Sequence, residues 1–124
     1  MIVADLVVTC PKHFFREWIA EGDAAGDPYT GEEWGWYMGG PKPPIGPGDR
    51  LYVVAWGRLR GFAPVTALRR TGGGKSAQWV ICRRGDAVAI TIPTSIPGFQ
   101  GWRHVFWPRD QEIPFPEWKT LGVM

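Results

Sequence analysis

The side chains best suited to ligand binding in this chain are its ten arginines, which outnumber the four lysines. Residues 50–84 carry eight basic side chains and no acidic one, although the net charge of the whole chain is only +2. A planar guanidinium binds phosphate through two parallel hydrogen bonds and also stacks on bases. The segment therefore predicts a surface for a polyanion, with Arg58 and Arg60 contacting phosphates. An ordinary solvated sheet face is the alternative.

The eight tryptophans supply a second kind of chemistry, because an indole ring can stack on a nucleic-acid base. Four of them lie in or next to glycine-rich segments: Trp34, Trp36, Trp79 and Trp102. Arg103 directly follows the last of these. An aromatic pocket beside arginines is the arrangement that single-stranded or flipped bases require. A tryptophan-rich core of a small barrel is the alternative, and Trp18, Phe62 and Trp107 are expected in that core.

The remaining motifs favour a protein without enzymatic activity, cofactor or metal. Residues 72–76 read Gly-Gly-Gly-Lys-Ser, but a phosphate-binding loop of the Walker type needs a glycine at position 69, where Arg69 stands. The two cysteines and two histidines lack the paired spacing of zinc ligands. The acidic side chains of Asp110 and Glu112 are expected to be solvated.

Short strands and one helix must position these residues. Residues 2–9 are apolar and β-branched except at Asp5, which predicts a buried strand. Pro11 suits the first turn of a helix, which Gly22 closes. Further strands are predicted over residues 34–37, 51–56, 58–67, 78–82, 87–92 and 102–107, and Pro64 implies an edge position or a bulge. Tight turns between them favour an α+β fold, namely a small, mainly antiparallel β-barrel of five or six strands with one main helix after the first strand.

The composition agrees with one folded domain spanning residues 1–124. Glycine and proline are frequent, at 17 and 12 residues, but 44% of the chain is hydrophobic, which excludes a disordered chain. Residues 108–124 are expected to form an irregular tail that packs on the body. No apolar run approaches the length of a membrane span and no signal peptide is evident, so a cytoplasmic protein is expected. Cys10 and Cys82 are expected to be buried, reduced thiols.

The order of these features resembles the PUA-like superfamily, especially its EVE and ASCH branches. The residues that carry the resemblance are Val8-Thr9-Cys10-Pro11-Lys12-His13-Phe14, Trp34-Gly35-Trp36, Ile45-Gly46-Pro47-Gly48-Asp49-Arg50-Leu51-Tyr52-Val53 and Leu59-Arg60-Gly61-Phe62-Ala63-Pro64-Val65. The resemblance implies a PUA-like pseudobarrel with a cleft between the end of the first strand, the early helix and the Gly-Trp loop. Members of this superfamily use that cleft for RNA or for modified bases in DNA. By position, Thr9, Lys12, Trp34 and Trp36 would border it.

Together these observations predict a non-enzymatic module that binds RNA or DNA, either single-stranded or carrying a modified base. Arginines would hold the phosphates, Trp34 or Trp36 would stack on a base, and Thr9 and Lys12 would read its polar edge. A small hydrolase acting on a modified nucleoside or nucleotide is one alternative. A protein-interaction factor without nucleic-acid contact is the other.

Overall fold

The computed structural model describes eight strands and one short helix. The residues that it describes are 5–9, 33–38, 42–55, 57–72, 78–84, 88, 90–99 and 101–114, and residues 33–38, 83 and 84 among them are described by their backbone alone. The strands are β1 (Leu6–Thr9), β2 (Glu33–Met38), β3 (Arg50–Ala55), β4 (Arg58–Thr71), β5 (Gln78–Arg84), β6 (Ile90–Thr91), β7 (Trp102–His104) and β8 (Ile113–Pro114). A 3₁₀ helix, η3, spans Arg109–Gln111. The main helix predicted to begin near Pro11 lies outside the described residues.

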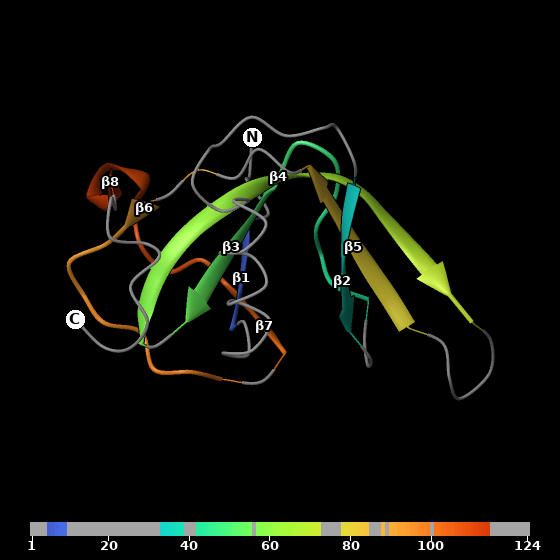
Figure 1. Ribbon diagram of the computed structural model, residues 1–124, viewed down its shortest axis with the longest axis horizontal. Helices are drawn as coiled ribbons and strands as arrows, with labels where there is room; N and C mark the ends of the chain where they lie inside the picture. Colours follow the sequence, from blue (N-terminus) through green and yellow to red (C-terminus); the bar gives the residue numbers. More distant parts are fainter. Residues whose placement is uncertain are drawn as a thin grey trace.

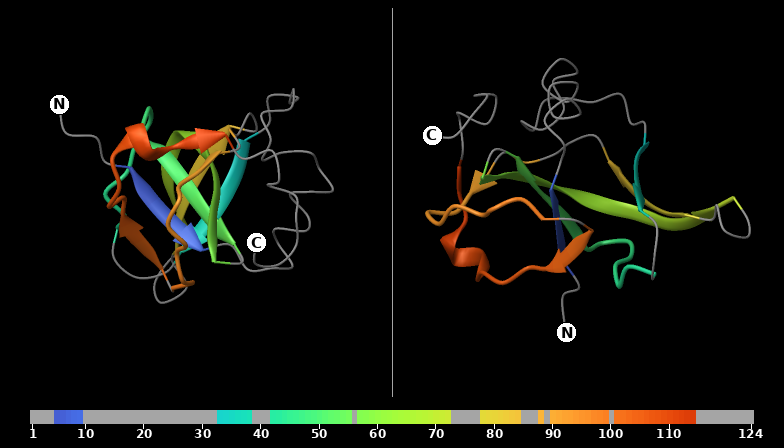
Figure 2. Two further views of the ribbon diagram at one scale, coloured as in Figure 1. Left: turned by 90° about the vertical axis from the view of Figure 1, so that its left-hand side faces the viewer. Right: turned by 90° about the horizontal axis from the view of Figure 1, so that it is seen from below.

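Six of the strands form one curled sheet in the order β2-β5-β4-β3-β1-β7, and β6 pairs with β8 in a second, two-stranded sheet (Figures 1 and 2). Every neighbouring pair is antiparallel except β1 and β3, which run parallel. Parallel neighbours need a long crossover, and residues 10–49 supply one here. The mainly antiparallel, barrel-like sheet agrees with the prediction.

The 14-residue strand β4 connects the two halves of the sheet (Figure 1). Residues 58–64 of β4 pair with β3, whereas residues 65–71 pair with β5, and the register shifts between Val65 and Ala67. Pro64 therefore stands where the strand exchanges one partner for the other. Proline has no N–H to donate to a ladder, so this position tolerates it. The irregularity predicted from Pro64 is present one residue later.

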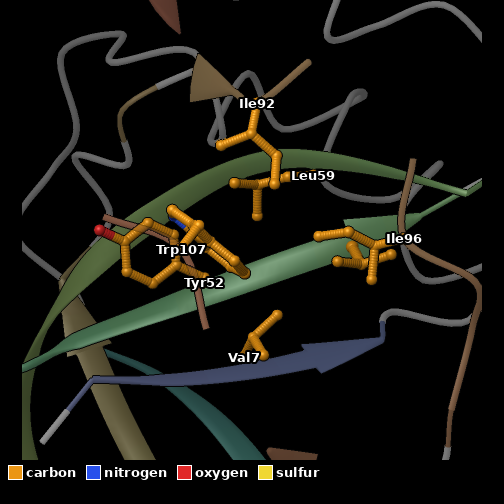
Figure 3. Packing of buried hydrophobic residues seen from close by; sticks show 7 residues of the cluster. Val7, Tyr52, Leu59, Ile92, Ile96 and Trp107 are labelled. Atoms are coloured by element: carbon orange, nitrogen blue, oxygen red, sulfur yellow. The ribbon is translucent and has the colours of Figure 1, made fainter. Parts of the chain in front are cut away.

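The core lies where one face of β1, β3 and β4 meets the chain between residues 92 and 107 (Figure 3). Its buried members are Val7, Tyr52, Val54, Leu59, Ile92, Ile96 and Trp107. Phe62 packs against this cluster, so the core positions predicted for Phe62 and Trp107 are confirmed. The Ile96 N–H donates to the carbonyl oxygen of Gly57 at 2.8 Å, which anchors the covering chain to the β3–β4 turn.

Three further predictions meet the structure in part. Cys82 is a buried, free thiol as expected, while Cys10 lies outside the described residues. Residues 108–114 of the predicted irregular tail form η3 and β8, and β8 pairs with β6. Among the described residues, no helix has the length and apolar character needed to cross a membrane.

Candidate functional site

The sheet order divides the predicted site residues into groups. Thr9, Trp102 and Arg103 lie on β1 and β7 at one edge of the sheet, whereas β2 and β5, which carry Trp34, Trp36 and Trp79, lie at the other edge. Lys12 lies outside the described residues. The described residues therefore present two surfaces to consider, one at each edge.

At the β7 edge, the side chains contact one another. The Thr9 Oγ1 accepts a hydrogen bond from the Phe99 N–H at 3.1 Å. The Arg103 guanidinium lies 4.5 Å from the centre of the Phe99 ring. Trp102 and His104 form an edge-to-face pair with ring centres 5.4 Å apart. The hydrogen bond ties Phe99 to the end of β1, and the Thr9 hydroxyl oxygen that was expected to read a base already accepts this bond.

The solvent-facing position predicted for Arg60 is wrong. Arg60 is fully buried, and its Nε donates to the Ala55 carbonyl oxygen at 2.9 Å. Burial, and next the neighbouring charge of Arg58, lower the pKa of Arg60. Arg58 is half-buried and its Nη2 donates to Thr91 Oγ1 at 3.4 Å. The β3–β4 register shifts between Val53 and Val54, opposite Arg60, and this bulge interrupts the alternation that was expected to place Arg58 and Arg60 on one face.

At the opposite edge, basic side chains gather around Trp79. We call residues 68–71 of β4, residues 78–81 of β5 and the paired backbone of residues 36–38 in β2 the Trp79 arm, the end of the sheet that extends away from the core in Figure 1. Arg70 stands directly opposite Trp79 in the β4–β5 ladder, with its guanidinium carbon 5.1 Å from the centre of the indole ring. The Lys42 ammonium, from the segment before β3, lies 5.5 Å from the same ring centre. Both distances are within the range of attraction between a cation and an aromatic face.

The two cations beside Trp79 are exposed, and the ring itself is half-buried. Within the described part of the chain, no carboxylate forms an ion pair with Lys42 or Arg70. Arg69, the next residue along β4, is also exposed but lies with Cys82 instead, since its Nη1 contacts the Cys82 sulfur at 3.2 Å. Successive residues of a strand point to opposite faces. The arm therefore has cations on both faces and the Trp79 ring on the face of Arg70.

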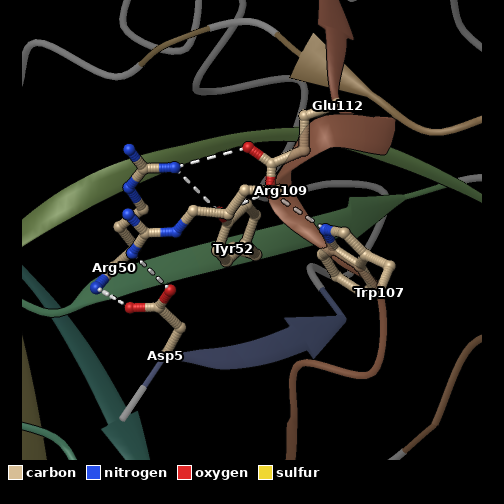
Figure 4. A network of polar contacts seen from close by, with 6 residues as sticks. All are labelled: Asp5, Arg50, Tyr52, Trp107, Arg109 and Glu112. Atoms are coloured by element: carbon tan, nitrogen blue, oxygen red, sulfur yellow. Dashed lines mark hydrogen bonds and ion pairs between the residues drawn. The ribbon is translucent and has the colours of Figure 1, made fainter. Parts of the chain in front are cut away.

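A polar network near the core, with buried carboxylates and an exposed arginine at its rim, was not predicted (Figure 4). Its centre is the carboxylate of Glu112, which accepts hydrogen bonds from Tyr52 Oη at 2.6 Å, Trp107 Nε1 at 3.0 Å and Arg50 Nη1 at 3.3 Å. Only 8% of the Glu112 side chain is exposed, so the expectation that it is solvated is wrong. Burial, and next the hydrogen bond to Glu112, raise the pKa of Tyr52 to about 12.

A second carboxylate extends this network to the N-terminal strand. Asp5 accepts one hydrogen bond from the Arg50 backbone N–H and one from Arg109 Nη2, both at 2.8 Å. The hydrogen bond that Arg109 donates to Asp5 raises the pKa of Arg109. The sequence did contain a signal, because Asp5 is the one charged residue in the apolar strand predicted over residues 2–9. We refer to Asp5, Arg50, Tyr52, Trp107, Arg109 and Glu112 as the Glu112 network.

The network and the arm differ in what they can offer a ligand. The polar atoms of the network are paired with one another, which is typical of a structural cluster. The arm presents exposed cations beside an aromatic ring, which is chemistry suited to an anionic, aromatic ligand. The described residues contain no group of three or more histidine, cysteine or acidic side chains able to hold a metal ion. Comparisons with models of known protein families, with curated proteins and with solved structures found no match to this chain.

Proposed function

We propose that this protein is a non-enzymatic nucleic-acid-binding domain that uses the Trp79 arm as its contact surface. The observation that carries the proposal is the convergence of two exposed cations, Lys42 and Arg70, on the half-buried Trp79 ring. The two cations come from separate segments of the chain. Arg70 belongs to the basic segment 50–84, and Lys42 precedes that segment in the chain.

Each component has a separate part in binding. The charges of Arg70 and Lys42 attract the phosphate backbone, and the Trp79 ring offers a flat surface on which a base stacks. The neighbouring strand β2 carries two of the other tryptophans considered as stacking residues, with Trp36 opposite Ile81 and Trp34 opposite Arg83 in the ladder. Arg60 has no part in this surface because it is fully buried.

The proposal also includes the fold family. A curled, mainly antiparallel sheet supports a PUA-like barrel, and a ligand of the kind bound by that superfamily would be RNA or a modified base in DNA. Under this proposal the arm would supplement the cleft expected beside Thr9 and Lys12. A cytoplasmic location belongs to the same proposal.

Salt dependence of oligonucleotide binding tests the proposed function. Fluorescence anisotropy with short labelled oligonucleotides, both single-stranded and duplex, should show affinity that falls steeply as salt is raised, by about 0.7 logarithmic units per logarithmic unit of salt for each single-strand phosphate contacted. Arg70→Ala and Lys42→Ala should each flatten this slope by about that amount. Arg69→Ala is the matched control, because it removes an adjacent exposed arginine on the other face and should change affinity less. Binding to no oligonucleotide at low salt would refute the proposal.

A further inference from the structure

We infer that the ligand of the Trp79 arm is a single-stranded nucleic acid, DNA or RNA, and not a duplex. The inference rests on the proposed function and concerns the same surface. It follows from the number of strands that pass beside Trp79 and from the kind of base surface that an indole ring can contact.

The arm is three strands wide at Trp79. Met38 of β2 stands opposite Trp79 on one side, and Arg70 of β4 stands opposite it on the other. Neighbouring strands lie about 4.8 Å apart, so three backbones span about 10 Å before their flanking groups are added. The major groove of a DNA duplex is about 12 Å wide and admits a helix or a two-stranded ribbon. A three-stranded arm therefore cannot carry Trp79 to the floor of that groove.

The position of the cations also favours an unpaired strand. In a duplex, the faces of the bases are covered by their neighbours, and only the base edges can be reached from a groove. An indole ring contributes most by stacking face to face, which requires an unstacked base. Lys42 and Arg70 lie over the ring, 5.5 Å and 5.1 Å from its centre, so a base that stacks on this ring takes the place of an exposed, long side chain, whose charge can then turn to the adjoining phosphates.

We expect Arg69 to make no contact with the bound strand. Arg69 lies on the face of the arm that carries Cys82, away from the Trp79 ring. A single strand that lies across the Trp79 face would contact Arg70 and leave Arg69 free of phosphate. A duplex held only by its charged exterior would respond to the loss of either arginine, since such binding is governed by charge.

The test compares three forms of one oligonucleotide sequence: the single strand, its duplex, and a single strand of the same length with abasic sugars. DNA and RNA versions of the single strand are measured side by side. We expect the single strand to bind at least about tenfold more tightly than the duplex at equal salt. The abasic strand should bind less tightly by about 5- to 150-fold, the loss corresponding to one stacked base.

Substitution of Trp79 tests whether the indole ring causes the preference for an intact single strand. Trp79→Ala should weaken single-strand binding by a similar factor, leave the salt slope unchanged and leave abasic-strand binding unchanged. Trp79→Phe keeps an aromatic face and should retain most of the affinity. Thermal unfolding of both variants verifies that they are folded, and the comparison of intact with abasic strands on the unsubstituted protein preserves the test if the alanine variant does not fold.

The outcomes separate the two proposals. Duplex binding as tight as single-strand binding, or equal binding of the abasic and intact strands, would overturn the inference and leave nucleic-acid binding itself standing. Absence of salt-dependent binding to every form would overturn the proposed function, and the inference would fall with it. A preference for RNA over DNA, or the reverse, supports the inference provided that the single strand is preferred over its duplex.

Discussion

The Glu112 network and the Trp79 arm both contain arginines and an indole ring, but they use them in opposite ways. In the network, Arg50 and Arg109 donate to buried carboxylates, and the Trp107 N–H also donates to Glu112. In the arm, Arg70 and Lys42 face an aromatic ring and remain exposed. Arginine and tryptophan therefore stabilise the fold where a carboxylate accepts their hydrogen bonds. They stay accessible to a ligand where no carboxylate of the described residues pairs with them.

The comparison teaches that basic residues in this chain must be judged by their partners and not by their number. Removing one member of a buried, charged cluster leaves other groups desolvated without a partner, which costs several kcal/mol. Removing an exposed cation from the face of a ring costs much less, because water replaces the lost contact. Substitutions in the two regions should therefore separate stability from binding.

The largest effect is expected for Glu112→Ala. The substitution removes the acceptor of three hydrogen bonds, and two of the donors, on Tyr52 and Trp107, are buried. We expect the free energy of unfolding to fall by about 3 kcal/mol, as measured by urea denaturation. The exposed Asp110 in η3 provides the control, because Asp110→Ala should change stability by no more than about 0.5 kcal/mol. Equal losses in the two variants would contradict the structural role assigned to Glu112.

Alkaline pH should weaken the network next. The pKa of Tyr52 is raised from 10.0 to about 12 in the folded protein, so the folded state retains a proton that the unfolded state releases between these values. The contribution of about 2–3 kcal/mol is therefore fully present below pH 10 and is lost as the pH rises toward 12. Unfolding measured across this range should show the decline. Tyr52→Phe should flatten it, and an unchanged decline in that variant would assign the effect to other groups.

A smaller loss is expected for Asp5→Asn. The carboxylate oxygens of Asp5 accept one hydrogen bond each, from the Arg50 backbone and from the Arg109 side chain. An amide of the same shape keeps one acceptor oxygen, so the free energy of unfolding should fall by about 1–2 kcal/mol. Raising the salt concentration should narrow the difference from the wild type only slightly, because Asp5 is buried. A difference that vanishes in salt would place Asp5 at the surface.

The smallest effect on stability is expected in the arm. Arg70→Ala removes one exposed cation from the Trp79 ring and should lower the free energy of unfolding by no more than about 0.5–1 kcal/mol. Urea denaturation beside the Glu112→Ala variant gives the measurement. A loss as large as that of Glu112→Ala would show that the arm is a structural cluster, and the distinction between the two regions would disappear.

Most strands could be predicted from the sequence because their signals are local. Apolar runs bounded by glycine and proline identified β3 and β5 to within two residues at each end. Strand β4 extends to Thr71, four residues past the predicted end, because residues 68–71 pair with residues 78–81 of β5. The stretch Leu68-Arg69-Arg70-Thr71 forms a strand because it pairs with β5. Such pairing between distant segments cannot be predicted from a short window of sequence.

The candidate site was predicted less well for the same reason. Trp79 was identified, but its contact with Lys42 depends on how the segment before β3 passes the arm. Arg60 was misplaced because the expected alternation is interrupted there by a bulge in the β3–β4 ladder, which the sequence does not signal at that residue. The Glu112 network joins groups 60 and 62 residues apart, and composition alone assigns a tail carboxylate to solvent.

The Asp5–Arg109 contact spans 104 residues, and β1 lies between β3 and the late strand β7. The ribosome delivers the N-terminal strand first, so β1 waits with an open edge until residues 102–104 have emerged. A chain interrupted before residue 107 lacks Trp107 from the core and both late partners of the early carboxylate network. Such a fragment exposes the apolar face of β1 and an unpaired strand edge, the features that chaperones and proteases recognise. Folding of this protein therefore requires translation to have passed residue 112.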